Sequence, residues 1–94
     1  MQMFDSPFGK IALTEERKRH IIAFHPDVAP HMRFIATTLA APDETAPSVH
    51  DMSVIICYRL IKSRKLFLSV VVKTGSRPFI VTAYLAKKPK RSIL

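Results

Sequence analysis

A strand-like stretch near the end of the chain, FIVTAYLAKKPKR at residues 79–91, carries two hydroxyl groups and then a cluster of positive charge. Thr82 and Tyr84 are two residues apart, so in a strand both side chains point to the same side. A strand that only fills a core needs neither hydroxyl, and a solubilising tail usually mixes both signs of charge. The pattern indicates a phosphate-binding surface, in which the hydroxyls donate hydrogen bonds and the cations that follow track the backbone of a nucleic acid: Lys87, Lys88, Lys90 and Arg91.

Two further cations, Lys73 and Arg59, fall within apolar runs, where a buried or strand-borne charge usually requires an anionic partner. Metal-free RNA cleavage needs a base for the 2′-hydroxyl, cations for the charge that develops at phosphorus, and an acid for the leaving 5′-oxygen. Histidine suits the first or the last task because its charge ordinarily changes near neutral pH. His20 is therefore the candidate acid–base group, and Lys73 and Arg59 are the candidate phosphate stabilisers. His25, at the end of the helix and next to Pro26, is ranked second, as a contact to RNA or as a cap of the turn.

The net charge of +8 is divided unevenly along the 94 residues. All seven acidic residues fall within the first 51 positions, which carry net −2, whereas the remainder carries +10 and no acidic residue. Such segregation favours a polyanionic partner, with nucleic acid ahead of an anionic membrane surface. A solvated basic face without a specific partner is the alternative.

The length suits one domain, residues 1–94, with a single small interior. Thr14 is suited to cap a helix that runs to about Phe24, because Pro26 disfavours helical geometry at His25. Asp27 then resembles a second N-cap, for a helix that ends before Pro42. We therefore expect helices at about 15–40, a loop at 41–51, a sheet at about 52–86 and a basic tail at 87–94.

Three apolar runs, MSVIICYRLI, LFLSVVVK and FIVTAYLA, are too closely spaced for crossover helices. They predict an α+β fold in which two N-terminal helices pack on a small, curved antiparallel meander of three or four strands. In the last strand, alternation places Ile80 with Thr82 and Tyr84, and assigns the core to the opposite set: Phe79, Val81, Ala83 and Leu85. A four-residue connection at GSRP would place Lys73 opposite Ile80, on the side of Thr82, Tyr84 and Ser69. The side on which Arg59 lies depends on the register across KSRK.

The stretches LTEERKRHIIAFHPDV, TLAAPDE, LFLSVVVK and FIVTAY resemble, in this order and at similar spacing, phage- and plasmid-associated proteins of the barnase, EndoU, colicin and RelE-like ribonuclease superfamily. The resemblance extends from about Leu13 to Lys87. It implies a RelE- or barnase-like fold, in which a helical histidine precedes a curved sheet with the active site on its open face. The chain differs from the pattern at KSRK, where an open hairpin is expected, and at Lys73, where a tyrosine is expected.

The resemblance implies a small metal-independent endoribonuclease of toxin type, acting on RNA such as tRNA or mRNA and blocked by an acidic antitoxin or immunity protein. His20 matches the helical histidine of the family and is the first candidate for the base or acid. Lys73, Arg59, Thr82 and Tyr84 complete the expected catalytic set, and His25 joins the RNA-binding set. A non-catalytic nucleic-acid-binding module on the same scaffold and a protein-interaction partner in a toxin–antitoxin-like system are the alternatives.

Other classes of function find little support in the residues. The four histidines and the single cysteine, Cys57, form no zinc-binding pattern, and the chain has no glycine-rich phosphate loop and no nucleophile elbow. We therefore expect no metal and no cofactor. No apolar run approaches the length of a membrane span and the N-terminus lacks a signal-peptide pattern, so the expectation is a cytoplasmic protein without a membrane partner.

Overall fold

The residues before the first helix form a β-hairpin, which the sequence pattern does not predict. The structure is a computed structural model that describes residues 1–89, and the hairpin consists of β1 (Gln2–Ser6) and β2 (Gly9–Leu13). At its turn the Ser6 hydroxyl donates to the Gly9 carbonyl at 2.7 Å and accepts from the Phe8 amide at 3.0 Å. Gly9 has a φ of +99°, a conformation that side chains with a Cβ rarely adopt. The sheet therefore begins near the N-terminus rather than at about residue 52.

The first helix, α1 (Glu15–Phe24), has the bounds that its capping residues predict. The Thr14 hydroxyl accepts a hydrogen bond from the Arg17 amide at 3.2 Å, and two glutamates occupy the first turn, where the helix dipole favours negative charge. The last turn closes when the His25 amide donates to the Ile21 carbonyl at 2.7 Å. Proline 26 then prevents the helix from continuing.

The second helical segment differs from the expected single helix. It is a 3₁₀-helix, η1 (Pro26–Phe34), followed by a short α-helix, α2 (Ile35–Ala40). Asp27 lies within the first turn of η1 and is not its cap. Pro26, at the first position, is compatible with a helix, but Pro30 lacks the amide hydrogen that a regular α-helix would use there, which accounts for the irregular first half.

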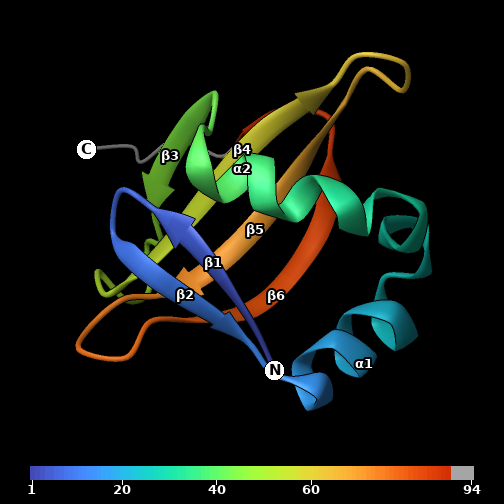
Figure 1. Cartoon of the computed structure of the whole chain (residues 1–94). Coiled ribbons are helices and arrows are strands. Elements are labelled where there is room, and N and C mark those ends of the chain that lie inside the picture. The colour runs from blue at the N-terminus through green and yellow to red at the C-terminus, as the bar shows by residue number, and fades with distance from the viewer. Residues whose placement is uncertain (90–94) are drawn as a thin grey trace.

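The described strands form one six-stranded mixed sheet with the order β1-β2-β6-β5-β4-β3, which corrects the expectation of a purely antiparallel meander of three or four strands. The predicted meander forms its centre, as β4 (Val54–Ile61), β5 (Leu66–Lys73) and β6 (Phe79–Ala86). An additional edge strand, β3 (Glu44–Pro47), occupies part of the expected loop 41–51. The sheet is strongly curled, as Figure 1 shows.

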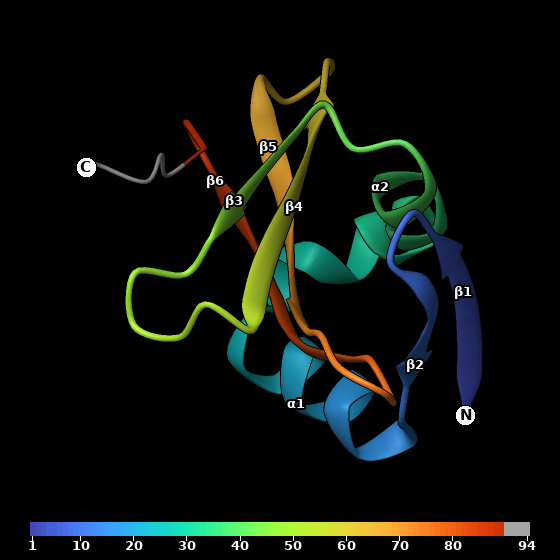
Figure 2. The ribbon, with the colours of Figure 1, turned by 90° about the vertical axis from the view of Figure 1, so that its left-hand side faces the viewer.

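The helices lie in two places. In Figure 2, η1 and α2 lie on one side of β4, β5 and β6, and the loop between β3 and β4 lies on the other. α1 packs against β6, close to where β2 pairs in parallel with β6 at Ala12 and Phe79 (Figure 1). The pairing between β2 and β6 consists of this one position, and α1 packs beside it. α1 thus covers a strand edge that would otherwise be exposed.

The core lies between the helices and one face of the sheet. Cys57, Leu68 and Val70 alternate along β4 and β5 and are completely buried, together with Ile21, Val28, Ile35 and Leu39 from the helices. In β6, Ala83 and Leu85 face this core as alternation predicts. We call the opposite side of β4, β5 and β6 the open face; its central residues, Tyr58 and Ser69, are nevertheless completely buried.

A bulge in β6 corrects the predicted assignment of its first residues. Val72 pairs with Ile80 whereas Val71 pairs with Thr82, so Val81 is an extra residue in the strand. The extra residue turns Ile80 into the core, where it is completely buried, and leaves Phe79 at the surface. Alternation across an uninterrupted strand cannot predict this change of side.

Candidate functional site

A row of three residues crosses the open face at the centre of the sheet. Tyr58 of β4 lies opposite Ser69 of β5, and Ser69 lies opposite Tyr84 of β6. Serine is small and Ser69 is buried, so the tyrosines on either side can reach each other across it and form a hydrogen bond. Burial first, and then the neighbouring Tyr58, raise the pKa of Tyr84 to about 12. The Tyr84 phenol therefore keeps its proton at neutral pH and can donate it.

Thr82 lies next to this row on the same face, because it pairs with Val71. Its Oγ1 is buried and, within residues 1–89, has no hydrogen-bond partner. Buried hydroxyls normally have a partner, and an unpaired one costs about 1–3 kcal/mol. The bulge thus leaves Thr82 and Tyr84 on one side, as predicted, while it removes Ile80 from that side.

His25 is the histidine that the structure brings to the strand hydroxyls. Its ring centroid lies 6.2 Å from that of Tyr84, and its side chain is half-buried at the end of α1. His20, the first candidate from sequence, lies one turn earlier and places its ring 4.6 Å from that of Phe24 on the same helix. The structure thus brings His25, and not His20, next to Tyr84.

Lys73 lies at the end of β5 on the open face, as predicted, but its amine already has anionic and polar partners. It forms an ion pair with Asp51 at 2.8 Å and a hydrogen bond with the Ser53 hydroxyl. The hydrogen bonds that Asp51 accepts, from Lys73 foremost and also from the hydroxyl and the amide of Ser53, hold the pKa of Asp51 well below its usual range. The residue opposite Lys73 is Phe79 rather than Ile80, a correction of one position that the bulge accounts for.

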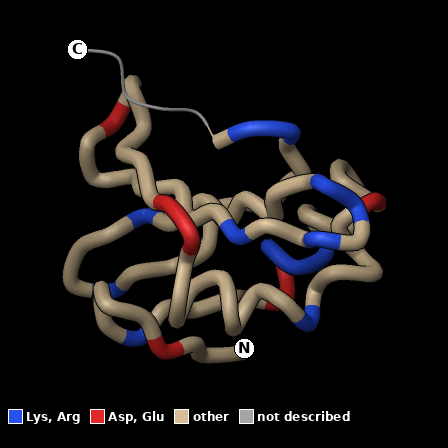
Figure 3. Tube along the Cα trace, turned by 90° about the horizontal axis from the view of Figure 1, so that it is seen from above, with Lys and Arg blue, Asp and Glu red and all other residues tan. Residues whose placement is uncertain are grey.

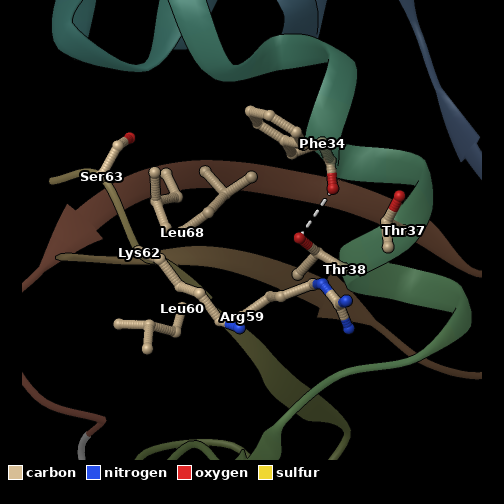
Figure 4. A pocket seen from close by; sticks show the side chains of 9 residues that line it. Phe34, Thr37, Thr38, Arg59, Leu60, Lys62, Ser63 and Leu68 are labelled. Carbon is tan, nitrogen blue, oxygen red and sulfur yellow. Dashed lines mark hydrogen bonds between the residues drawn. The ribbon is translucent and has the colours of Figure 1, made fainter. Parts of the chain in front are cut away.

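Arg59 lies on the helix side of the sheet, away from Lys73, Thr82 and Tyr84. It pairs with Leu68, a core residue, and its guanidinium donates to the Ala41 carbonyl at 2.6 Å, just beyond the end of α2. Arg59 also lines a pocket of about 420 Å³ whose walls include Phe34, Thr38 and Lys62 (Figure 4). The structure therefore separates Arg59 from the other predicted phosphate stabilisers.

Of the four cations that are predicted to follow the backbone of a nucleic acid, two lie within the residues that the structure describes. Lys87 and Lys88 are exposed directly after β6, where Figure 3 shows a continuous blue segment. Since Ala86 pairs with Phe67 at the start of β5, this segment lies at the same end of the sheet as the basic β4–β5 turn, 62–65. Lys90 and Arg91 lie outside the described residues.

Three residues at the site were not among the candidates from sequence: Tyr58, Asp51 and Ser53. Tyr58 alternates with Arg59 in a strand, and an antiparallel register across KSRK would have been enough to place it opposite Ser69. Asp51 and Ser53 reach Lys73 through the loop between β3 and β4, whose path no local pattern predicts.

The described residues contain no group of three His, Cys, Asp or Glu side chains that could hold a metal ion, and none of their helices is long and apolar enough to cross a membrane. Comparisons of the chain with family models, with curated proteins and with solved structures found no match. The likeness to the ribonuclease superfamily thus remains a resemblance carried by the short motifs.

Proposed function

We propose that this protein is a small, toxin-like endoribonuclease that cleaves RNA by metal-independent transesterification on the open face of the sheet. The observation that carries the proposal is the contact between the rings of His25 and Tyr84, which joins α1 to β6. A histidine beside a protonated tyrosine supplies a proton acceptor and a proton donor in one place. The surrounding hydroxyls and the basic end of the sheet supply groups that bind phosphate.

The chemistry assigns one task to each group. His25 takes the proton from the 2′-hydroxyl of the substrate, and the resulting oxygen attacks the adjacent phosphorus. Tyr84, which is protonated at neutral pH, gives its proton to the 5′-oxygen as the bond from phosphorus to that oxygen breaks; its raised pKa makes it a weaker acid than an ordinary tyrosine. The products are a 2′,3′-cyclic phosphate and a free 5′-hydroxyl, and a proton passes from His25 back to Tyr84 through solvent.

The charge distribution supports a polyanionic substrate. Residues 52–94 carry ten basic side chains and no acidic one, and two of these cations, Lys87 and Lys88, directly follow the strand that holds Thr82 and Tyr84. The same charge would attract an acidic antitoxin or immunity protein, which could cover the site.

The test is an incubation of the purified protein with total tRNA and a structured RNA, in the presence of EDTA, followed by denaturing gel electrophoresis. The variants are His25→Ala, Tyr84→Phe and His20→Ala, with His50→Ala as a matched control because His50 is exposed in the loop between β3 and β4. We expect His25→Ala to lose activity by about 100-fold or more, the usual contribution of a general acid or base. His50→Ala should cleave as the parent does, leaving 2′,3′-cyclic phosphate ends. Loss of cleavage in His20→Ala but not in His25→Ala would transfer the role to His20.

A non-catalytic RNA-binding module is the second candidate, and the ion pair between Lys73 and Asp51 favours it. A cation neutralised by its own chain contributes less to the transition state than a free one. This alternative predicts salt-dependent RNA binding and no product under any condition. A protein-interaction partner in a toxin–antitoxin-like system predicts neither binding nor cleavage.

A further inference from the structure

Phe24 is a large apolar side chain that the core does not use. It is 70% exposed at the last position of α1, while Ile21 on the same helix is completely buried. Single exposed apolar residues are common on protein surfaces, so exposure alone assigns no role. Phe24 directly precedes His25 in the chain, and this position indicates a role.

Two aromatic pairs lie at the end of α1: Phe24 with His20, and His25 with Tyr84 of β6. The centroid of the Phe24 ring lies 4.6 Å from that of His20, which supports it from one turn earlier on the same side of α1. The next residue, His25, lies 6.2 Å from Tyr84, centroid to centroid. Phe24 and His25 are neighbours in the chain, and consecutive Cα atoms are about 3.8 Å apart, so the exposed ring is attached directly beside the histidine proposed to act in RNA cleavage.

The helix that carries Phe24 also carries cations, between one and two turns earlier, while the exposed Asp27 follows Phe24 by three residues. Arg17, Lys18 and Arg19 are consecutive residues of α1, and the acidic residues of the helix are confined to its first turn. An exposed aromatic ring among cations is the arrangement with which proteins bind single-stranded nucleic acid, because bases stack on the ring while the cations hold the phosphates.

We propose that Phe24, supported by His20, forms a stacking subsite for one base of single-stranded RNA beside the His25–Tyr84 pair. The inference rests on the proposed function and adds a role for a residue outside the acid–base chemistry. Every base has a flat aromatic face, so the subsite accepts all four bases and contributes affinity without sequence preference. It also accounts for the placement of His20, whose ring contacts Phe24 on α1.

The test measures the fluorescence anisotropy of a labelled 12-nucleotide uridine strand that carries 2′-O-methyl groups, which prevent cleavage. Phe24→Ala is expected to bind about fivefold to a hundredfold more weakly than the parent, the range seen when a stacking ring is removed. Phe24→Trp should bind at least as tightly as the parent, and Phe24→Leu, which keeps an apolar side chain without a ring, should bind as weakly as Phe24→Ala. Ile22→Ala is the matched control, because Ile22 is 40% exposed on the same helix.

Two further measurements separate stacking from a change in the fold or in charge. On a strand of the same length whose bases are replaced by abasic linkers, the parent and Phe24→Ala should bind equally. The slope of log affinity against log salt concentration should be the same for both proteins, since phenylalanine contacts no phosphate. Circular dichroism should show thermal unfolding within a few degrees of the parent, as expected for an exposed side chain.

The outcomes distinguish the stacking subsite from the proposed ribonuclease function on which it rests. If the parent binds the uridine strand and Phe24→Ala binds it equally well, the stacking subsite is wrong while the RNA-binding proposal stands. An equal loss of affinity on the abasic strand would also overturn the subsite. If the parent binds neither strand at low salt, the proposed function fails and the subsite fails with it.

Discussion

At the scale of single residues, Lys73 is where the prediction from sequence and the structure differ most. A lysine at the end of a strand on the open face was a candidate phosphate ligand, yet Asp51 and Ser53 from the loop between β3 and β4 hold it. The Asp51 carboxylate occupies the place of an anion beside this amine. Both partners are partly exposed, so water and salt reduce the strength of the pair and a phosphate group can compete for the lysine.

The variant Asp51→Asn should bind RNA more tightly than the parent, because it removes a negative charge from the open face and frees Lys73. We expect a gain of up to about fivefold at low salt and little change in the free energy of unfolding, since an exposed ion pair contributes about 1 kcal/mol or less. Anisotropy titrations with the uncleavable uridine strand measure the gain. Asp5→Asn is the control: it also removes one carboxylate paired with a lysine, at 3.3 Å from Lys10, but in the β1–β2 hairpin. Equal gains in both variants would assign the effect to net charge.

At the scale of elements, α1 has two tasks that depend on its exact end. It packs against β6 beside the pairing with β2, and it places His25 against Tyr84. Thr14 fixes where the helix begins, and His25 before Pro26 fixes where it ends. The edges of the sheet are β1 and β3; β3 is short and ends at Pro47, which cannot donate a ladder hydrogen bond and so limits pairing with another chain.

Removal of the cap in Thr14→Ala should destabilise the protein by about 1 kcal/mol, because the Arg17 amide loses its acceptor. In a domain of this size that loss lowers the melting temperature by about 4–8 °C. Thr37→Ala is the control, since Thr37 is an exposed helical threonine of α2 where alanine is at least as favourable. Urea and thermal unfolding followed by circular dichroism measure both variants. A loss in Thr14→Ala no larger than in Thr37→Ala would show that the cap contributes nothing to stability.

At the scale of the whole molecule, the division of charge along the chain coincides with the division between the central strands and the helices. The strands that form the open face, β4, β5 and β6, all come from the half of the chain that carries +10, and the helices come from the half with net −2. The cations of the β4–β5 turn and those after β6 meet at one end of the sheet. A phosphate backbone that reaches Tyr84, the partly exposed member of the tyrosine row, would be attracted to this end.

The salt dependence of RNA binding should therefore fall when this end is neutralised. For Lys87→Ala combined with Lys88→Ala we expect the slope of log affinity against log salt to become less steep by about 1.4, because each contact with a single strand contributes about 0.7. Lys10→Ala combined with Arg33→Ala removes the same charge from the hairpin and the helix layer, and should leave the slope nearly unchanged. Equal changes in the two double variants would contradict a defined path for the RNA backbone.

The sequence by itself determined those features that depend on neighbours along the chain. The cap at Thr14, the end of α1 before Pro26, the three central strands and the shared side of Thr82 and Tyr84 follow from local geometry and from period-two alternation, and the structure confirms them. The division of charge between the two halves is a property of the sequence and needs no fold.

Tertiary structure decided which of these residues meet. The N-terminal hairpin and β3 are short strands whose pairing energy comes from distant partners, so local propensity does not reveal them. The bulge at Val81 changed the side of Ile80, and the register across KSRK placed Tyr58 on the open face and Arg59 on the helix side. The choice of His25 over His20 depends on where α1 packs against β6. Residues far apart in the sequence come into contact because the fold buries apolar surface. The pattern along the sequence shows which residues are apolar, but it only partly determines which of them pack against each other.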